Sequence, residues 1–258
     1  MEVYEMATKG RANVLTSEEW ERVFSVIMEK RHAEKNTAIM KMSRHLGLKA
    51  QELAALTIND VTKLEGNDGE ARHSFTLRKE VYIAPRETPK NRSRSKYVKK
   101  SLTFTVSEFE DTIEKVVSLV KAGREINPND FYPKKNQKST ISRLLPLVKE
   151  PLINALNIYI KIRLINQPFL RSTDPLFVTQ KGGSYSPNTL QEHIALMLRN
   201  WAGIANATSN SGRRGLITHA LNKYDVNVAQ KVAGVRSPSS IAVTYNDRIT
   251  PNLNDSKK

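Results

Sequence analysis

Residues 47–53 read Gly47-Leu-Lys-Ala-Gln-Glu-Leu53, and this stretch lies between two segments of helical pattern. Gly47 ends the helix predicted over 36–46, because glycine adopts the left-handed conformation of a helix C-terminus at little cost. A shorter helix is predicted over 50–56. The stretch therefore predicts a tight junction between two helices, with Lys49 just ahead of the second one.

Three further segments follow in order along the chain. The first is Lys138-Ser-Thr-Ile-Ser-Arg-Leu-Leu-Pro-Leu147, a basic stretch ahead of a predicted helix. The second runs from Pro175 through Gly183 and predicts a strand and a turn, after which Ser186-Pro187 opens a helix with proline at its favoured first position. The third is Asn210-Ser-Gly-Arg-Arg214, followed by helices and then by Thr244-Tyr245.

The remaining pattern is mostly helical. Thr16-Ser-Glu-Glu19 is a capping box that starts a helix, and apolar residues at helical spacing predict helices over 107–122, 151–164, 213–223 and 226–233. Alternating apolar residues between 75 and 83 predict short strands. The expected fold is mainly α with a small antiparallel β-sheet.

The charge of the chain points to a polyanionic partner. Lys and Arg number 41 against 26 Asp and Glu, which gives a formal net charge of +15 over 258 residues. Such an excess is self-repelling unless an anionic partner neutralises it, so nucleic acid or an acidic membrane surface is the expected partner. The chain has no cysteine, which excludes disulfides and thiolate nucleophiles. No apolar run is long enough to span a membrane, and a cytoplasmic, DNA-associated location is expected.

In this order, the four segments resemble the catalytic domain of tyrosine recombinases of the phage-integrase type. The resemblance covers roughly residues 15–247 and implies the tyrosine-recombinase catalytic-domain fold. It implies site-specific DNA cleavage and rejoining through a 3′-phosphotyrosine, as in DNA integration by mobile genetic elements. It further implies a homo-oligomer on DNA, a dimer or a tetramer, and a reaction that needs neither a metal nor another cofactor.

The resemblance also assigns roles to individual residues. Tyr245 is at the position of the nucleophile, and Arg213 at that of a phosphate-binding arginine. Lys138 corresponds to the lysine that protonates the leaving 5′ oxygen, although Lys90 is a rival for that role. Arginine suits phosphate binding because its guanidinium donates two parallel hydrogen bonds. A catalytic Arg213 that faces phosphate is expected to contribute little to the core.

The chain departs from the family pattern at three other positions, of which the family's catalytic site includes those of Lys49 and Asn210. Lys49 replaces an arginine, and lysine keeps the charge but loses the bidentate fork. Asn210 replaces a histidine and cannot act as an acid or base near neutral pH. Val235 replaces a histidine or tryptophan. These departures predict a protein that binds phosphate better than it transfers protons, and whose catalysis is slow or absent.

The expected domain organisation is a leader over 1–14, one catalytic domain over 15–247 and a flexible tail over 248–258. Residues 64–130 resemble an insertion that carries a basic hairpin and a helix. Basic residues of this hairpin and of the C-terminal third are candidate DNA contacts: Lys90, Arg92, Arg94, Lys96, Arg214 and Arg236.

An alternative interpretation treats the chain as a non-catalytic DNA-binding regulator or a recombination accessory factor. Residues 43–61, with Gly47 at the turn, and residues 227–245 both resemble helix-turn-helix units. In that case Tyr245 is a packing or phosphate-contacting residue of a recognition helix. The alternative leaves the basic hairpin and residues 138–214 without a role.

Overall fold

The computed structural model describes residues 12–66, 71, 74–84, 106–123, 142–235 and 241. Contacts divide the chain into two compact units, one formed by 1–84 with 141–258 and the other by 85–140. The insertion predicted over 64–130 thus overlaps the second unit, but it begins before residue 85 and ends before residue 140. The described residues are mainly helical with two small antiparallel sheets, which confirms the predicted fold class.

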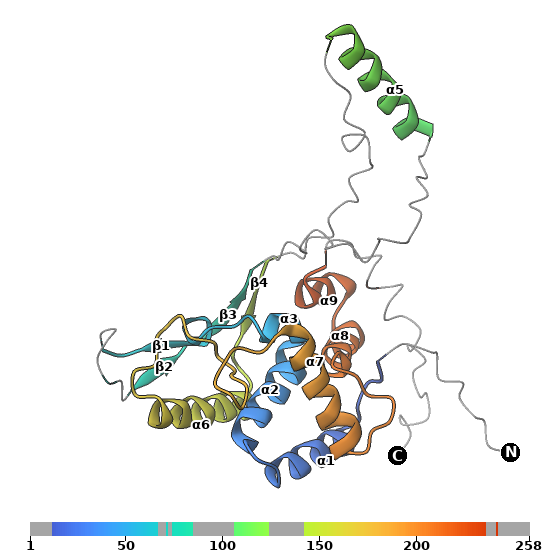
Figure 1. The fold of residues 1–258 in the computed structure, drawn as a ribbon. Coiled ribbons are helices and arrows are strands. Elements are labelled where there is room, and N and C mark those ends of the chain that lie inside the picture. The colour runs from blue at the N-terminus through green and yellow to red at the C-terminus, as the bar shows by residue number, and fades with distance from the viewer. Residues whose placement is uncertain are drawn as a thin grey trace, which may run out of the picture. The chain divides into compact units, whose positions relative to one another are not determined.

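The first unit contains most of the described helices (Figure 1). They are α1 (Ser17–Met28), α2 (Ala33–Leu46), α3 (Ala50–Leu53), α4 (Ile58–Val61), α6 (Glu150–Asn166), α7 (Pro187–Leu196), the π-helical turn η2 (Met197–Trp201), α8 (Ser211–Lys223) and α9 (Val226–Ala233). The predicted capping box is confirmed, since Glu19 N–H donates to the Thr16 hydroxyl and Thr16 N–H to the Glu19 carboxylate. The second unit contributes α5 (Val106–Lys121).

Helix α2 lies at the centre of the first unit and packs against α6, α8 and α1 (Figure 1). Its apolar side chains Ile39, Met40 and Met42 are fully buried. The helix begins three residues before its predicted start and ends as predicted at Gly47, whose φ of 62° is left-handed. Because α2 crosses the core, its two ends reach two separate surfaces of the unit.

A close approach of two backbones fixes the start of α8 against α2. A Cβ on Gly212 would meet the main chain of Ser43 at 2.8 Å, well inside van der Waals contact. Only glycine at 212 therefore lets α8 pack this closely on the last turns of α2. The approach brings Arg213 beside Gly47.

The strands form two antiparallel pairs. β1 (Thr62–Leu64) pairs with β2 (Phe75–Leu77), and β3 (Glu80–Ile83) pairs with β4 (Arg143–Pro146). The second pair ends with Ile83 opposite Arg143, so residues 84–142 connect its two strands. The strand predicted over 175–179 was wrong in extent: this segment makes only isolated bridges, Thr57 with Pro175 and Val178 with Ser184.

Candidate functional site

A buried ion pair connects two of the segments that resemble recombinase motifs. The Arg143 guanidinium donates from Nη1 and Nη2 to the two carboxylate oxygens of Glu52, at 2.9 and 2.8 Å. Both side chains are buried. Burial alone would raise the pKa of Glu52, but the hydrogen bonds and charge of Arg143, together with other neighbours, bring it below its usual value. The pair therefore stays ionised and joins α3 to β4.

Lys49 lies beside this pair. Its backbone N–H donates to the Glu52 carboxylate at 2.8 Å, which caps the start of α3. Burial lowers the pKa of the Lys49 ammonium, and the nearby positive charge of Arg213 lowers it further. Lys49, Arg143 and Arg213 thus contribute three positive charges around one carboxylate, and the site is electropositive.

Arg213 is held by main-chain carbonyls from two distant segments. Nη1 donates to the Gly47 carbonyl at 2.9 Å, and Nη2 donates to the carbonyl of Ala233. The side chain is 4% exposed. The prediction that Arg213 contributes little to the core was therefore wrong, because its guanidinium bridges the end of α2 and the end of α9.

Asn210 and Arg214 flank Arg213 and differ from each other in exposure. Asn210 is exposed at the start of α8, and its carbonyl accepts from the backbone N–H of Arg214 at 2.8 Å. Arg214 is buried, with 6% of its surface exposed, although a solvated position was expected for a DNA contact. The reason is geometric, since Arg214 lies in the first turn of α8, where that helix packs against the core.

The buried arginines Arg143 and Arg213 both lie against the turn that ends α9. Gly234 is left-handed, with φ of 58°, and a Cβ there would lie 2.6 Å from Nη1 of Arg143. The preceding residue, Ala233, accepts the hydrogen bond from Arg213. The backbone at 233–234, next to Val235, is therefore fixed by two cations at once.

The other predicted site residues lie outside the described residues. They are Tyr245, Lys138, Lys90, Arg92, Arg94, Lys96 and Arg236. The pairing of Ile83 with Arg143 nevertheless bears on the two rival lysines. In the sequence, Lys90 follows Ile83 and Lys138 precedes Arg143, so both belong to the segment that connects β3 to β4.

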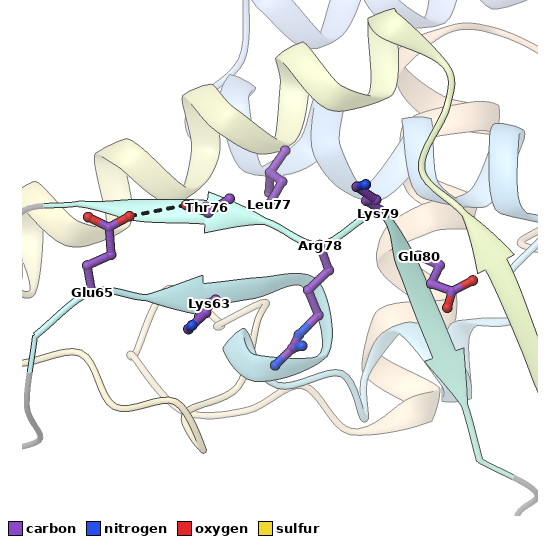
Figure 2. A pocket seen from close by; sticks show the side chains of 7 residues that line it. All are labelled: Lys63, Glu65, Thr76, Leu77, Arg78, Lys79 and Glu80. Carbon is purple, nitrogen blue, oxygen red and sulfur yellow. Dashed lines mark hydrogen bonds between the residues drawn. The ribbon is translucent and has the colours of Figure 1, made fainter.

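A second charged surface lies on the β1–β2 pair. Figure 2 shows the pocket of about 580 Å³ between these strands and β3, lined by Lys63, Arg78 and Lys79 among others. Arg78 is anchored by hydrogen bonds to the main-chain and side-chain oxygens of Asn59. Two acids, Glu65 and Glu80, share this pocket, so its charge is mixed.

The structure gives no support to a helix-turn-helix at residues 43–61. The last helix of that segment, α4, has only four residues, and both Ile58 and Val61 are fully buried. A recognition helix must present an exposed face to the major groove. The second candidate segment, 227–245, lies largely outside the described residues after 235.

Two features are absent from the described residues. None of their helices is long and apolar enough to cross a membrane. None of their His, Asp and Glu side chains gather into a group that could hold a metal ion.

Solved structures of site-specific recombinases share this fold. The XerA recombinase aligns with 94% of this chain and 61% of its own, at a TM-score of 0.54 and 18% identity. The Tn1549 transposon integrase in complex with transposon right end DNA aligns with 90% of this chain and 61% of its own, at a TM-score of 0.53 and 16% identity. A lambda integrase dimer bound to a COC′ core site aligns with 95% of this chain and 62% of its own, at a TM-score of 0.52 and 12% identity. The chain has the tyrosine-recombinase catalytic-domain fold.

At these identities the likeness establishes the fold, and the chain spans less than two thirds of the length of each of these recombinases. No family model and no curated protein matches the sequence. Within the tyrosine-recombinase fold, sequence reasoning placed Lys49 and Arg213 in the site but missed Glu52 and Arg143. Both stood inside the quoted motifs, and their opposite charges were the only signal that they pair.

Proposed function

We propose that the protein binds double-stranded DNA and cleaves and rejoins its strands through Tyr245. The observation that carries the proposal is the gathering of Lys49, Arg143 and Arg213 around the single carboxylate of Glu52, in a tyrosine-recombinase fold. A net positive, partly buried site favours a phosphodiester over a neutral ligand. The recombinase structures in complex with DNA agree with this partner.

In the proposed reaction, the Tyr245 hydroxyl loses its proton to solvent and its oxygen attacks a backbone phosphorus atom. A bond forms between the phenolic oxygen and phosphorus, the bond to the 5′ oxygen breaks, and a 3′-phosphotyrosine results. The leaving oxygen takes a proton from Lys138, or from Lys90 in its place. Lys49 and Arg213 stabilise the charge on the non-bridging oxygens.

The departures from the family pattern favour slow chemistry. Asn210 can donate a hydrogen bond to phosphate but cannot move a proton near neutral pH, and Val235 can do neither. The proposed protein therefore binds phosphate well but cleaves DNA slowly. It acts as a homo-oligomer on DNA, a dimer or a tetramer. A cytoplasmic, DNA-associated location accompanies the proposal.

The test is a nicked candidate DNA site, which traps the covalent intermediate because the cut fragment diffuses away. We expect a protein–DNA adduct after hours of incubation, mapped to Tyr245 and absent in Tyr245→Phe. Tyr224→Phe, at an exposed tyrosine on the end of α8, is the matched control and should still form the adduct. An adduct at Tyr224 would reject the assigned nucleophile.

A non-catalytic DNA-binding protein on the same fold is the second candidate. It is favoured by the use of both terminal guanidinium nitrogens of Arg213 on main-chain carbonyls. It predicts that no adduct forms while duplex binding remains salt-dependent, with a log–log slope of about −5 if roughly six phosphates are contacted. A slope near zero would reject DNA binding in both candidates.

A further inference from the structure

A separate cavity lies at the N-terminal end of α2, away from the site at Gly47. Its volume is about 470 Å³, and it is walled by the turn between α1 and α2, the start of α2, the turn at 179–181, α7 and η2. A helix of 14 residues is roughly 20 Å long, so the length of α2 separates this cavity from the cation cluster. The cavity is therefore a different site from the one assigned to the phosphodiester.

The lining of this cavity is strongly cationic. Lys30, Arg31, Lys35 and Lys181 line it, and none of the described residues that line it is acidic. Lys30, Arg31 and Lys181 are exposed. The described lining thus carries positive charge alone, so the potential inside favours an anion.

At its base the cavity has a buried cation. Lys35 is 7% exposed, and its Nζ donates one hydrogen bond, at 2.9 Å, to the Val178 carbonyl. An ammonium has further donors that this bond does not use. Behind it lies a second buried cation, Arg163, which is 6% exposed and has no hydrogen-bond acceptor within the described residues for Nε and Nη1.

Two neighbouring buried cations that form no ion pair with a carboxylate among the described residues are costly, because burial penalises charge and like charges repel. Both effects are visible on Lys35, whose pKa is lowered by burial and then by Arg163. An anion bound in the cavity would reduce both the cost of burying these charges and the repulsion between them. The arrangement therefore favours an occupied site over an empty structural one.

Aromatic rings form the rest of the wall. The His193 ring stacks on Tyr185, with centroids 5.9 Å apart, and meets the edge of Trp201 at 6.0 Å. Burial, followed by the positive charge of Lys35, lowers the pKa of His193 to about 4. Near neutral pH the wall therefore consists of three uncharged aromatic rings, which suit a flat heterocycle.

We propose that this cavity binds a nucleoside monophosphate, with the phosphate on Lys35 and the rim cations and the base against the aromatic wall. The same chemistry is offered by a free nucleotide and by the 5′-phosphorylated end of a DNA strand. The proposal is independent of cleavage by Tyr245, because none of the residues it uses belongs to the cation cluster.

The test is calorimetric titration of the full chain with AMP, adenosine and inorganic phosphate. We expect AMP to bind at least about tenfold more tightly than either part, since the site contacts both. Lys30→Gln combined with Lys181→Gln should weaken AMP binding about tenfold. Lys161→Gln, at an exposed lysine of α6 outside the cavity, is the matched control and should leave it unchanged.

A buried variant sharpens the test. Lys35→Met keeps the length and apolar stem of the side chain. It should abolish AMP binding without lowering the melting temperature, because it removes a buried charge that repels Arg163. If Lys35→Met does not fold, the double rim variant decides. A single-stranded oligonucleotide with and without a 5′ phosphate then separates the two sources, and a free nucleotide is assigned where AMP binds more tightly.

Three results would overturn the proposal. One is the absence of AMP binding up to about 10 mM, which corresponds to a binding free energy weaker than that of a millimolar ligand. Another is inorganic phosphate binding as tightly as AMP, which would remove the role of the aromatic wall. The last is equal AMP affinity in the double rim variant and in Lys161→Gln.

Discussion

The guanidinium of Arg143 lies directly against Gly234, so closely that a Cβ at 234 would come within 2.6 Å of Nη1. The same guanidinium forms the bidentate pair with Glu52. The backbone at the end of α9 and the ion pair beside Lys49 are therefore mechanically coupled. A substitution at Gly234 should therefore displace Arg143, and a substitution at Arg143 should alter the packing of the backbone at Gly234.

Gly234→Ala tests this coupling. The substitution introduces left-handed strain of about 1–2 kcal/mol and also pushes Arg143 away from Glu52. Gly203→Ala is the matched control, because Gly203 has a similar φ of 69° but nothing within 4 Å of its Cβ position. Urea denaturation should show Gly234→Ala to be less stable than the control by at least about 1 kcal/mol. Equal losses would mean that Arg143 moves aside freely.

Gly212→Ala should be destabilising although it places alanine in a helix. Its Cβ would meet the Ser43 main chain at 2.8 Å, and the start of α8 would have to move away from α2. We expect a loss of about 1–3 kcal/mol, as for overpacking. Gly215→Ala lies on the same helix with its nearest neighbour at 3.8 Å, and it should be neutral or stabilising. Chemical denaturation of the two variants makes the comparison.

The Glu52–Arg143 pair should make folding stability depend on acidity. The folded pKa of Glu52 is lowered from 4.5, so the unfolded chain binds its proton first as pH falls. The stabilisation is present above about 4.5 and is lost as pH falls through the lower folded value. Glu52→Gln should be less stable at neutral pH, and the difference from the native protein should shrink in acid. A difference that is constant across pH would contradict the pair's role.

Arg213→Ala should lower stability as well as any activity. The guanidinium donates to the buried carbonyls of Gly47 and Ala233, and a hydrogen bond from a charged donor is worth about 1.5–3 kcal/mol. We expect a loss of about 3 kcal/mol or more. Arg199→Ala, at an exposed arginine of η2, should change stability little. Equal melting temperatures of the two variants would show that the two hydrogen bonds to carbonyls do not contribute to stability.

Lys49→Arg should increase strand cleavage on the nicked site by about tenfold or more, because arginine adds a second hydrogen bond to phosphate. The helix cap is unaffected, since it uses the backbone N–H of Lys49. The measurement is the rate of adduct formation at fixed DNA concentration, with Lys161→Arg as the control. An unchanged rate in a folded Lys49→Arg protein would mean that residue 49 does not face the phosphate.

Sequence reasoning reached the fold because its signals were local. The capping box at Thr16, the stop at Gly47 and the helix over 226–233 depend on near neighbours, and all three are confirmed. The burial of Arg213 and Arg214 could not be predicted from such local signals. It depends on the approach of α8 to α2 at Gly212, which no periodicity of a single segment encodes.

The same limit explains the missed ion pair. Glu52 and Arg143 are far apart in the chain, and their contact follows from the pairing of β4 with β3 and from the position of α3. The site residues that were found came from the resemblance of short motifs, while their hydrogen-bond partners came only from tertiary structure. Lys35 and Arg163 were missed for this reason too.

The long connection between Ile83 and Arg143 has a consequence for folding kinetics. The β3–β4 ladder cannot form until residues 84–142 have closed a loop, and contacts at such separation are slow to form. The equilibrium cost is modest, because each doubling of a flexible loop adds only about 0.6 kcal/mol. Shortening this connection should therefore accelerate refolding far more than it raises stability.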